Sequence, residues 1–386
     1  MNIILSTIGT LQNQKESAHI TTINLAKELQ TLGHKVIIIT QRIPHQPTEI
    51  TIDNITIYRP YRIPFLSKLF SHPLAIHKLQ KEKKINIDII HSFSATPLFA
   101  LNTFLSKLFT KNAKTIHTIK SYSRDKNGNR GNIFLRLVDK VTVPTKTHAQ
   151  KINIKKEKSE VIYSPVNLNK FQPKDETKLK QKYHYQNKKI ILYYGALWNN
   201  KGVDNLIKAI PLLIKERENN KDKHKDPQNL HFLFLPRYRN IEPQLKLIKE
   251  LNIQNNIEFI TNDVIIEDYV NLADVIVLPY KNLLGTEGNP SCLLEALACK
   301  TPVVTTKLPE LEELFSNCTI MAIPNNPIDL AEKISQSLTQ NNRKIIENGF
   351  QLVQSFDQKK IAKDFIKIYQ ELKSKNPNRS KLLDIQ

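Results

Sequence analysis

Two glutamates eight positions apart, Glu287 and Glu295, mark the segment whose residue types best suit ligand binding. Between them, Asn289 is a good N-cap and Pro290 a good first residue for the apolar helix that follows. The start of a helix presents amides and a partial positive charge, which together attract phosphate groups. The amides expected at this helix start are those of Ser291 and Cys292.

These residue types indicate a ligand that carries both phosphate and sugar. A carboxylate is a poor partner for phosphate, but it accepts hydrogen bonds from sugar hydroxyls. We expect Glu287 to lie in the loop before the helix and Glu295 about a turn and a half inside it, so the two carboxylates do not share a helix face. They would then lie on either side of a ligand that crosses the helix N-terminus. A nucleotide sugar, in which a diphosphate joins two polyols, has this order of groups.

The chain has only nine glycines, and four of them form two pairs that border loops. Gly195 and Gly202 border the first loop, and Gly285 and Gly288 border the second. Glycine permits tight turns and close approach of the backbone to a ligand, although a strand-to-helix turn can require glycine for structure alone. The sequence has no G-x-G-x-x-G and no G-x-x-x-x-G-K-[ST] pattern. Their absence disfavours a dinucleotide-dependent oxidoreductase and a P-loop NTPase.

Short β-branched runs alternate with amphipathic stretches along the chain, as in parallel sheets covered by helices on both faces. Strands are predicted in the first half at 2–8, 35–40, 55–58, 87–91, 115–117 and 140–143, with a helix at 18–32. Strands are predicted in the second half at 189–194, 230–235, 257–260, 275–278 and 302–305, with helices at 204–215, 242–251, 265–272, 290–299 and 356–374. Two such series predict an α/β protein with two Rossmann-like domains joined by a polar linker.

The segment from Glu287 to Val304 closely resembles the E-x7-E signature of the retaining GT-B glycosyltransferases of family 4, the glycosyl transferases group 1. The resemblance implies two Rossmann-like domains that face each other across a cleft, and a metal-independent transfer of a sugar with retention at the anomeric carbon. It implies no cofactor, because the nucleotide-sugar donor is a substrate. It also implies that Glu295 binds the nucleotide ribose and that Glu287 binds the donor sugar.

Other segments resemble the same family along nearly the whole chain. The stretch from Gly195 to Gly202 is similar to the family's donor loop, which implies that Lys201 contacts the donor diphosphate. Strand ends at His91 and His117 are similar to two family strand ends, and this similarity implies that His117 faces the donor sugar. The resemblance assigns Gly195, Gly288, Asn289, Ser291 and Cys292 to nucleotide binding.

With this resemblance, the sequence indicates a division into five parts. We expect a first, acceptor-side domain over 1–165, an interdomain linker over 166–188, and a nucleotide-sugar donor domain over 189–355. A helix over 356–375 is expected to cross back to the first domain, and 376–386 to form a tail.

The sequence departs from the family pattern at positions that bear on activity. Alanine stands at 196 where the family has an arginine on the leaving diphosphate, and Arg237 is a candidate to replace that charge. A glycine pair of the family appears as Glu16-Ser17, and a further glycine appears as Lys300. The alternative is therefore a catalytically silent GT-B-fold binding protein or partner subunit. A nucleotide-sugar epimerase of the same architecture is a minor alternative.

The positive charge is concentrated in the first half of the chain. Residues 1–200 contain 32 basic and 12 acidic residues, whereas 201–386 contain 25 and 24. Such asymmetry favours an anionic partner for the first half, or it reflects a Lys-rich composition alone. No nucleic-acid-binding motif accompanies the charge. The expected partners are therefore a UDP- or GDP-linked sugar and a glycan or glycolipid acceptor.

Residues 58–84 mix basic and aromatic side chains, which suits an anionic membrane surface. The alternative for this stretch is an ordinary amphipathic helix packed on its own domain. No apolar run reaches the roughly 18–20 residues that span a bilayer, and 2–8 indicates a strand rather than a signal peptide. With only three cysteines and no Cys-x-x-Cys, we expect a reducing compartment and no metal site. The expected location is cytoplasmic, with possible peripheral association with the membrane.

Overall fold

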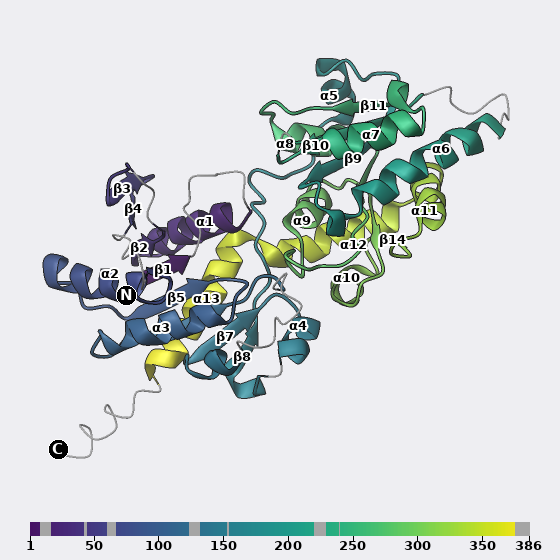
Figure 1. Ribbon diagram of the computed structural model, residues 1–386. Helices are drawn as coiled ribbons and strands as arrows, with labels where there is room; N and C mark the ends of the chain where they lie inside the picture. The colour runs from purple at the N-terminus through teal and green to yellow at the C-terminus, as the bar shows by residue number, and fades with distance from the viewer. Residues whose placement is uncertain are drawn as a thin grey trace. The chain divides into compact units, whose positions relative to one another are not determined.

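The computed structural model describes residues 1–7, 17–41, 45–59, 67–122, 132–152, 154–219, 229–238 and 240–374. These residues belong to two compact units, which are drawn in Figure 1. Unit 1 comprises Met1–Pro165, Gly285–Gly288 and Gln358–Gln386, and unit 2 comprises Val166–Leu284 and Asn289–Asp357.

Unit 1 is built on a sheet with the strand order β3-β4-β2-β1-β5-β6-β7-β8 over the described part of the chain. Neighbouring strands are parallel except for the antiparallel pair β3 and β4. The strands are β1 (Asn2–Thr7), β2 (Lys35–Ile39), β3 (Glu49–Ile52), β4 (Ile55–Tyr58), β5 (Ile89–Phe93), β6 (Lys114–Thr118), β7 (Lys140–Val143) and β8 (Ser159–Val161). The chain runs outward in both directions from β1, so the strand order reverses between β1 and β5. Open α/β sheets bind ligands at such a point.

Helices cover the unit 1 sheet and close separate apolar clusters against it. The helices are α1 (Ser17–Thr31), α2 (Ser67–Lys83), α3 (Leu98–Leu108), α4 (Lys146–Ile152) and α13 (Gln358–Ser374), with 3-10 turns at η1 (Asn132–Arg136) and η2 (Lys156–Lys158). One cluster joins α1, the sheet and α13, to which the last helix contributes Ile361, Phe365 and Tyr369. Burial of its apolar face explains why this C-terminal helix packs in unit 1.

Unit 2 has a second sheet with the strand order β11-β10-β9-β12-β13-β14, and its described strand pairs are all parallel. The strands are β9 (Lys188–Gly195), β10 (Asn229–Pro236), β11 (Ile257–Phe259), β12 (Val275–Leu278), β13 (Val303–Thr306) and β14 (Ile320–Ala322). The strand order reverses between β9 and β12, which marks the ligand-binding edge of this sheet.

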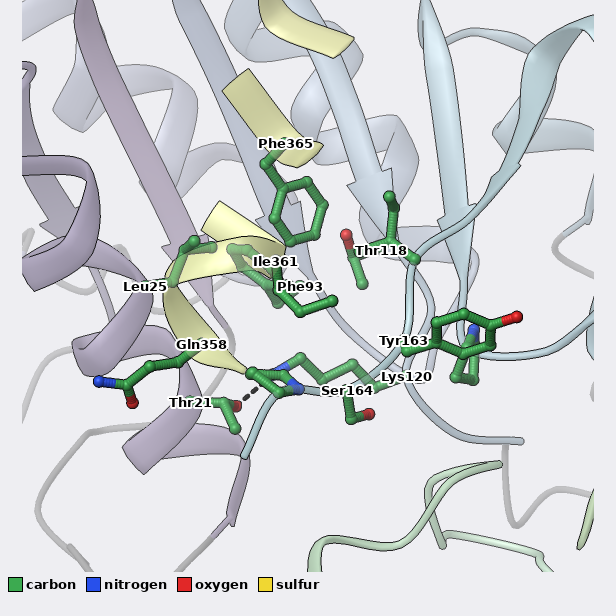
Figure 2. A pocket seen from close by; sticks show the side chains of 13 residues that line it. Thr21, Leu25, Phe93, Thr118, Lys120, Tyr163, Ser164, Gln358, Ile361 and Phe365 are labelled. Atoms are coloured by element: carbon green, nitrogen blue, oxygen red, sulfur yellow. Dashed lines mark hydrogen bonds between the residues drawn. The ribbon is translucent and has the colours of Figure 1, made fainter. Parts of the chain in front are cut away.

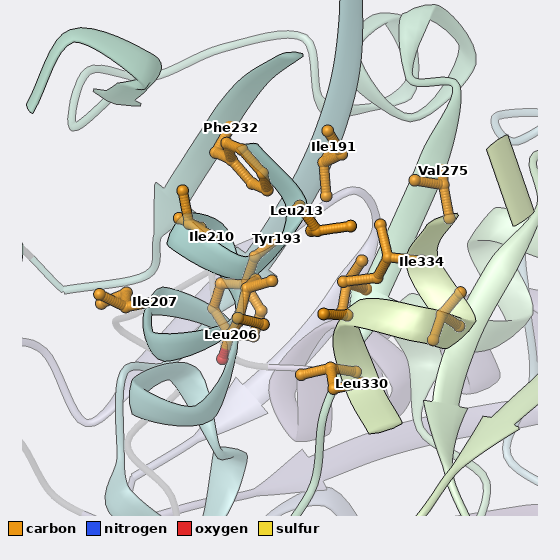
Figure 3. Packing of buried hydrophobic residues seen from close by; sticks show 14 of the residues in the cluster. Ile191, Tyr193, Leu206, Ile207, Ile210, Leu213, Phe232, Val275, Leu330 and Ile334 are labelled. Atoms are coloured by element: carbon orange, nitrogen blue, oxygen red, sulfur yellow. The ribbon is translucent and has the colours of Figure 1, made fainter. Parts of the chain in front are cut away.

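The helices of unit 2 pack on both faces of its sheet. They are α5 (Glu176–Lys182), α6 (Val203–Asn219), α7 (Glu242–Glu250), α8 (Ile266–Leu272), α9 (Ser291–Ala298), α10 (Pro309–Phe315), α11 (Pro327–Thr339) and α12 (Arg343–Val353), with 3-10 turns at η3 (Asn199–Lys201), η4 (Gln254–Asn256) and η5 (Gln354–Phe356). Figure 3 shows a buried apolar cluster of unit 2 that includes Leu206 of α6, Ile334 of α11 and Tyr193 of β9. This packing fixes β9 as the rigid base of the loop that follows it.

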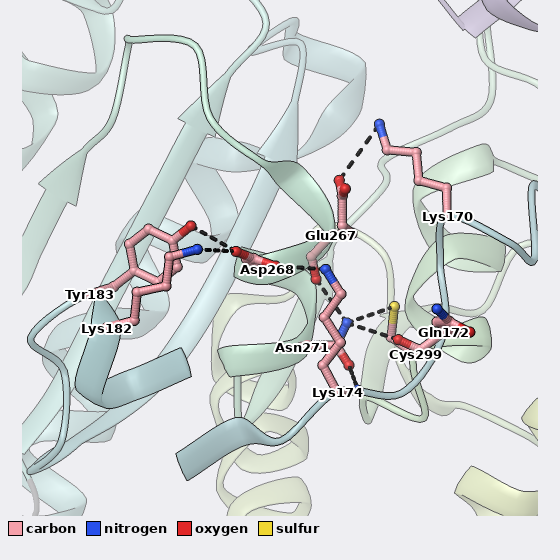
Figure 4. A network of polar contacts seen from close by, with 9 residues as sticks. All are labelled: Lys170, Gln172, Lys174, Lys182, Tyr183, Glu267, Asp268, Asn271 and Cys299. Atoms are coloured by element: carbon pink, nitrogen blue, oxygen red, sulfur yellow. Dashed lines mark hydrogen bonds and ion pairs between the residues drawn. The ribbon is translucent and has the colours of Figure 1, made fainter. Parts of the chain in front are cut away.

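The polar segment 166–188, which the sequence indicates as a linker, is packed on unit 2 through a network of charges (Figure 4). Asp268 of α8 accepts hydrogen bonds from Lys174 at 2.7 Å, from Lys182 at 2.8 Å and from the Tyr183 hydroxyl at 2.8 Å. Burial acts to raise the pKa of Asp268, but these three donors outweigh it and lower the pKa to about 2. The segment therefore holds α5 against α8 as part of the unit.

The predicted α/β class with two parallel sheets is confirmed. Most predicted elements lie within one to three residues of their observed bounds, because buried parallel strands read as continuous apolar runs. The antiparallel strand β3 was not predicted. Its side chains alternate between exposed and partly buried, so it lacks such a run.

Candidate active site

The donor-side candidates of unit 2 gather at the carboxyl ends of β9, β10 and β12, beside the start of α9. Tyr194, near the end of β9, donates its hydroxyl to Glu295 Oε2 at 3.0 Å and also lies 2.7 Å from the carbonyl oxygen of Cys292. Burial, with the charge of Glu295, raises the pKa of Tyr194 well above its ordinary value. Tyr194 therefore remains a hydrogen-bond donor and orients the Glu295 carboxylate. The sequence analysis did not identify Tyr194 as part of the site.

Two cations lie close to the same helix start. β10 pairs with β9 in the register Pro236↔Gly195, and the Arg237 amide donates to the Gly195 carbonyl oxygen at 2.9 Å. The backbone of Arg237 therefore lies beside Gly195, next to Ala196, the position at which the family has an arginine. Burial raises the pKa of the Cys292 thiol, and the charges of Lys201 and Arg237 act in the opposite direction. The positive charges of Lys201 and Arg237 therefore both act on Cys292 in the first turn of α9.

Gly202 requires the backbone freedom that the sequence analysis expected of it. Its φ is +71°, and a Cβ at this position would lie 1.8 Å from the carbonyl oxygen of Pro279, which directly follows β12. The preceding residue, Lys201, has its amine 5.0 Å from the centroid of the Tyr280 ring. The donor loop is therefore packed directly on the segment after β12. Gly195 has a φ of +136° but no close contact at its Cβ position.

The helix start differs by one residue from the expected one. α9 begins at Ser291, Pro290 occupies the N-cap position in an extended conformation, and no side chain caps the helix. Asn289, expected as the cap, is fully buried before the helix. The fixed φ of proline suits both the last extended residue and the first helical residue, and sequence alone did not distinguish the two.

The E-x7-E segment is divided between the two units. Residues 285–288 belong to unit 1, where Glu287 forms an antiparallel bridge with Ser121 and the Gly285 amide donates to the Tyr122 carbonyl oxygen at 2.9 Å. Asn289 onward belongs to unit 2. The expected placement of Glu287 and Glu295 on either side of one ligand therefore stays a prediction.

Gly288 ends the part of this segment that packs in unit 1. A Cβ at Gly288 would lie 3.1 Å from a Thr145 methyl and 3.2 Å from a Pro144 ring carbon. The absence of a side chain at Gly288 thus serves close packing against the end of β7 in this structure.

His117 is fully buried in unit 1, and its expected contact with the donor sugar stays a prediction. Its side chain is fully buried within β6, where Nδ1 hydrogen-bonds with Ser92 Oγ at 2.7 Å. Its ring lies near Phe99 of α3, and burial lowers its pKa to about 3. His91 is also fully buried, and it hydrogen-bonds with Tyr369 and Thr118. Both histidines belong to strand interiors, because their strands extend one or two residues further than predicted.

Lys120 is a charged residue beyond the end of β6 that the sequence analysis did not single out. It stands two residues beyond the end of β6, its amine donates to Thr21 Oγ1 of α1, and it lies 5.3 Å from the centroid of the Phe93 ring. Loss of hydration lowers the pKa of Lys120, and the charge of Glu287 acts to raise it. No local sequence signal identifies it, because its contacts come from segments far apart in the chain (Figure 2).

The described part of the membrane candidate 58–84 forms most of α2. Its residues Ala75, Ile76 and Leu79 pack into the apolar cluster beneath the helix, whereas Leu74 is exposed. The stretch 60–66 lies outside the described residues, as do Glu16 and the tail 376–386. Within the described ranges, no helix is long and apolar enough to span a membrane, and no three His, Cys, Asp or Glu side chains are grouped to hold a metal ion.

Two family descriptions match the chain. Residues 174–352 match "Glycosyl transferases group 1", and residues 18–170 match "Glycosyltransferase Family 4". The chain belongs to this family of glycosyltransferases, and the family predicted from its motifs is confirmed.

Relatives with known sequences agree with this assignment. The GPI3 subunit of phosphatidylinositol N-acetylglucosaminyltransferase from Saccharomyces cerevisiae is 22% identical over 378 residues, which cover 91% of this chain and 79% of the relative. The uncharacterized glycosyltransferase MJ1178 from Methanocaldococcus jannaschii is 25% identical over 366 residues, which cover 90% and 93%.

Solved structures show the fold. The sucrose-phosphate synthase from Thermosynechococcus elongatus has a TM-score of 0.78 at 18% identity, covering 97% of this chain and 100% of that one. A glycosyltransferase from Rickettsia africae ESF-5 has a TM-score of 0.75 at 24% identity, covering 97% and 99%. Anabaena HepE in complex with UDP-glucose has a TM-score of 0.73 at 15% identity, covering 96% and 100%. The predicted two-domain GT-B fold is confirmed.

Proposed function

We propose that this glycosyltransferase moves a sugar from a UDP- or GDP-linked donor to a hydroxyl acceptor, with retention at the anomeric carbon and without a metal ion. The observation that carries the proposal is the grouping in unit 2 of Lys201, Arg237 and Glu295 around the start of α9, at the point where the strand order reverses. HepE, which has a similar fold, is described in complex with UDP and with UDP-glucose.

The difficult chemical step is the departure of a nucleoside diphosphate from the sugar carbon. Cations and helix-start amides that are already in place stabilise the charge that develops on the leaving group. Lys201 and Arg237 would supply the cations, and α9 would supply amides from Ser291 and Cys292. Glu295, oriented by Tyr194, would accept hydrogen bonds from the ribose hydroxyls.

The acceptor side is assigned to unit 1. Glu287 would bind the donor sugar from the loop that bridges to Ser121. The GPI3 relative is named for transfer to phosphatidylinositol, which supports a glycolipid or lipid-linked glycan as acceptor. The basic composition of the first half is consistent with such an acceptor and with peripheral membrane association.

The test is a binding and turnover screen with UDP-, GDP- and ADP-linked sugars. We expect one nucleotide class to raise the melting temperature and to be slowly hydrolysed. Glu295→Ala should abolish the shift, because the ribose loses its acceptor. Glu332→Ala on the exposed face of α11 is the matched control and should leave the shift unchanged.

Ala196 motivates the alternative of a catalytically silent binding protein or partner subunit. Its side chain is fully buried, and its carbonyl oxygen accepts a hydrogen bond from the Tyr193 hydroxyl at 2.6 Å. Nucleotide binding without release of the nucleoside diphosphate, even when glycolipid acceptors are added, would establish the alternative. Absence of any binding would remove both functions.

A further inference from the structure

The only tryptophan of the chain, Trp198, lies in the donor loop after β9. It stands between Ala196 and Lys201, and its carbonyl oxygen accepts a hydrogen bond from the Lys201 amide at 2.8 Å. Its indole ring stacks on the ring of Tyr238, with 6.0 Å between the ring centroids and 26° between the planes. Because Tyr238 follows β10, the stack joins the ends of two neighbouring strands of the unit 2 sheet.

The stack restrains the backbone around Arg237. Tyr238 directly follows Arg237, whose own amide donates a hydrogen bond to the Gly195 carbonyl oxygen at 2.9 Å. An aromatic pair contributes more than the area that it buries, and it favours particular ring orientations. Arg237 is therefore held against the donor loop by a hydrogen bond at its own amide and by a ring contact one residue later.

The donor loop gives this contact a firm support. The Ala196 carbonyl oxygen accepts a hydrogen bond from the Tyr193 hydroxyl at 2.6 Å, and the Asn200 carbonyl oxygen accepts one from the Lys281 amide at 2.9 Å. These bonds fix the loop on either side of Trp198. The indole is thus a rigid surface, and the segment after β10 is positioned against it.

The charge of Arg237 reaches the surroundings of α9, although β10 lies on the far side of β9 from β12. The charge acts on three groups, namely Tyr193, Tyr280 and Cys292. Burial raises the pKa of each of them, and Arg237 acts in the opposite direction. The Lys201 amine lies 5.0 Å from the centroid of the Tyr280 ring. Two cations from neighbouring loops therefore act on the same place.

We propose that Trp198 and Tyr238 are positioning residues, whose stack holds Arg237 ready for the donor diphosphate where the chain lacks an arginine at position 196. An arginine that is already ordered loses less conformational entropy when it binds an anion, so it contributes more to affinity. Neither ring needs to touch the ligand, because both act through Arg237. The inference rests on the proposed function, which places Arg237 on the diphosphate.

The test uses inorganic pyrophosphate, which stands for the diphosphate that UDP-, GDP- and ADP-linked sugars share. Isothermal titration calorimetry of the full chain measures its affinity. We expect Arg237→Ala to weaken pyrophosphate binding by about tenfold and Tyr238→Ala by about fivefold. Tyr238→Phe keeps the ring and should retain most of the affinity. Phe350→Ala removes a half-buried ring that packs on Lys300 in the same unit, and this matched control should bind as the unaltered chain does.

A double variant separates positioning from a general loss of structure. If the stack acts through Arg237, Tyr238→Ala should have no further effect in a chain that already carries Arg237→Ala. Losses that multiply to about fiftyfold would show that the rings act independently of Arg237, and would overturn the proposal. Tyr238→Leu keeps apolar volume without a ring and should weaken binding as Tyr238→Ala does, so the test also stands if the alanine variant fails to fold. Full affinity of Tyr238→Leu would contradict a role for the ring.

Trp198 itself reports whether the two rings stack in solution. Since the chain has no second tryptophan, its emission is that of Trp198 alone. Tyr238→Ala should shift the emission to longer wavelength because the indole gains contact with water, whereas Phe350→Ala should leave it unchanged. Unaltered emission of Tyr238→Ala would overturn the proposal.

The same titrations distinguish a failure of this inference from a failure of the proposed function. Lys201→Ala should weaken pyrophosphate by about tenfold, which locates the bound anion at the donor loop. An affinity that depends on Lys201 and Arg237 but not on Tyr238 would overturn the positioning role and leave the proposed function standing. An affinity that depends on none of the three residues, or no binding at all, would remove both.

Discussion

The two units share one architecture but differ in charge and in how their sites are built. Unit 1 contains 33 basic and 14 acidic residues, whereas unit 2 contains 24 and 22. The candidate site of unit 2 is made from loops that follow the adjacent strands β10, β9 and β12. Gly202 lies where the backbone of one loop is crowded against the next. A pocket of unit 1 (Figure 2) is lined by residues of α1, strand ends and the C-terminal helix, from Thr21 to Phe365, which are 344 positions apart in the chain.

Buried histidines provide the largest expected difference between the units. His72, His91 and His117 of unit 1 are all fully buried, and burial lowers the pKa of each, to about 4 for His72 and about 3 for His117. Each is neutral in the folded chain and takes up a proton in the unfolded chain below its ordinary pKa of about 6.5. Stability from these groups is therefore complete above pH 6.5 and is lost as the pH falls from 6.5 toward the folded values.

We expect unit 1 to lose about 2 kcal/mol at pH 5 for each of His72 and His117, with a further loss from His91 in the same direction. In unit 2, Asp268 has a pKa of about 2, below its unfolded value of about 3.8, so its contribution is lost only below about pH 4. Hydrogen exchange at pH 7 and pH 5, resolved by peptide, measures each unit separately. Equal loss of protection in both units at pH 5 would contradict this difference.

Backbone crowding in the two units can be compared at one glycine from each unit. Gly202 and Gly33 both have positive φ, at +71° and +83°, but a Cβ at Gly33 meets nothing within 4 Å. Gly33→Ala should therefore cost about 1 kcal/mol from backbone strain alone. Gly202→Ala should cost more than about 3 kcal/mol, because its Cβ would overlap the Pro279 carbonyl.

Urea denaturation of both variants measures these costs, and UDP binding reports the donor loop. Similar stability of Gly202→Ala and Gly33→Ala would mean that the loop after β9 relaxes freely. The loop could then not hold Lys201 in a fixed position against the Tyr280 ring.

The sequence was sufficient for much of unit 2 and for less of unit 1, for physical reasons. Gly202 was recognisable because a crowded turn demands glycine locally, whereas Glu295 and Lys201 were selected through their resemblance to the family motifs, and their roles stay predictions. Lys120 was overlooked because its contacts and its electrostatic surroundings depend on Thr21, Phe93 and Glu287, which only the fold brings together.

His117 shows how strongly the expected surroundings of a side chain depend on where a strand ends. A histidine near a predicted strand end resembles a site residue, but β6 continues past it to Thr118. One further residue of strand was enough to place the imidazole inside the protein, beside Ser92. Strand ends are the least certain feature of a sequence-based prediction, and strand-end residues are the ones that carry chemistry in this fold.

Substitution of Arg237 has the smallest expected effect of the three predictions. It tests whether a residue after the neighbouring strand β10 replaces the arginine that the family has at position 196. The Arg237 amide donates a hydrogen bond to the Gly195 carbonyl oxygen. The charge of Arg237, like that of Lys201, acts to lower the pKa of Cys292. If Arg237 neutralises the leaving diphosphate, Arg237→Ala should lower kcat by about 10- to 100-fold, and Arg237→Lys should recover part of it. Arg343→Ala, on the exposed side of α12, is the matched control and should have unaltered turnover.

The way in which the loss divides between kcat and KM separates two roles for this residue. A cation that acts on the developing charge of the leaving group changes kcat, whereas a cation that only holds the bound donor changes KM. Unaltered kcat and KM in Arg237→Ala would leave Lys201 and α9 as the proposed groups on the diphosphate. Ala196 would then mark a positive charge that this chain lacks and that turnover does not require, because a measurable kcat already excludes the catalytically silent alternative.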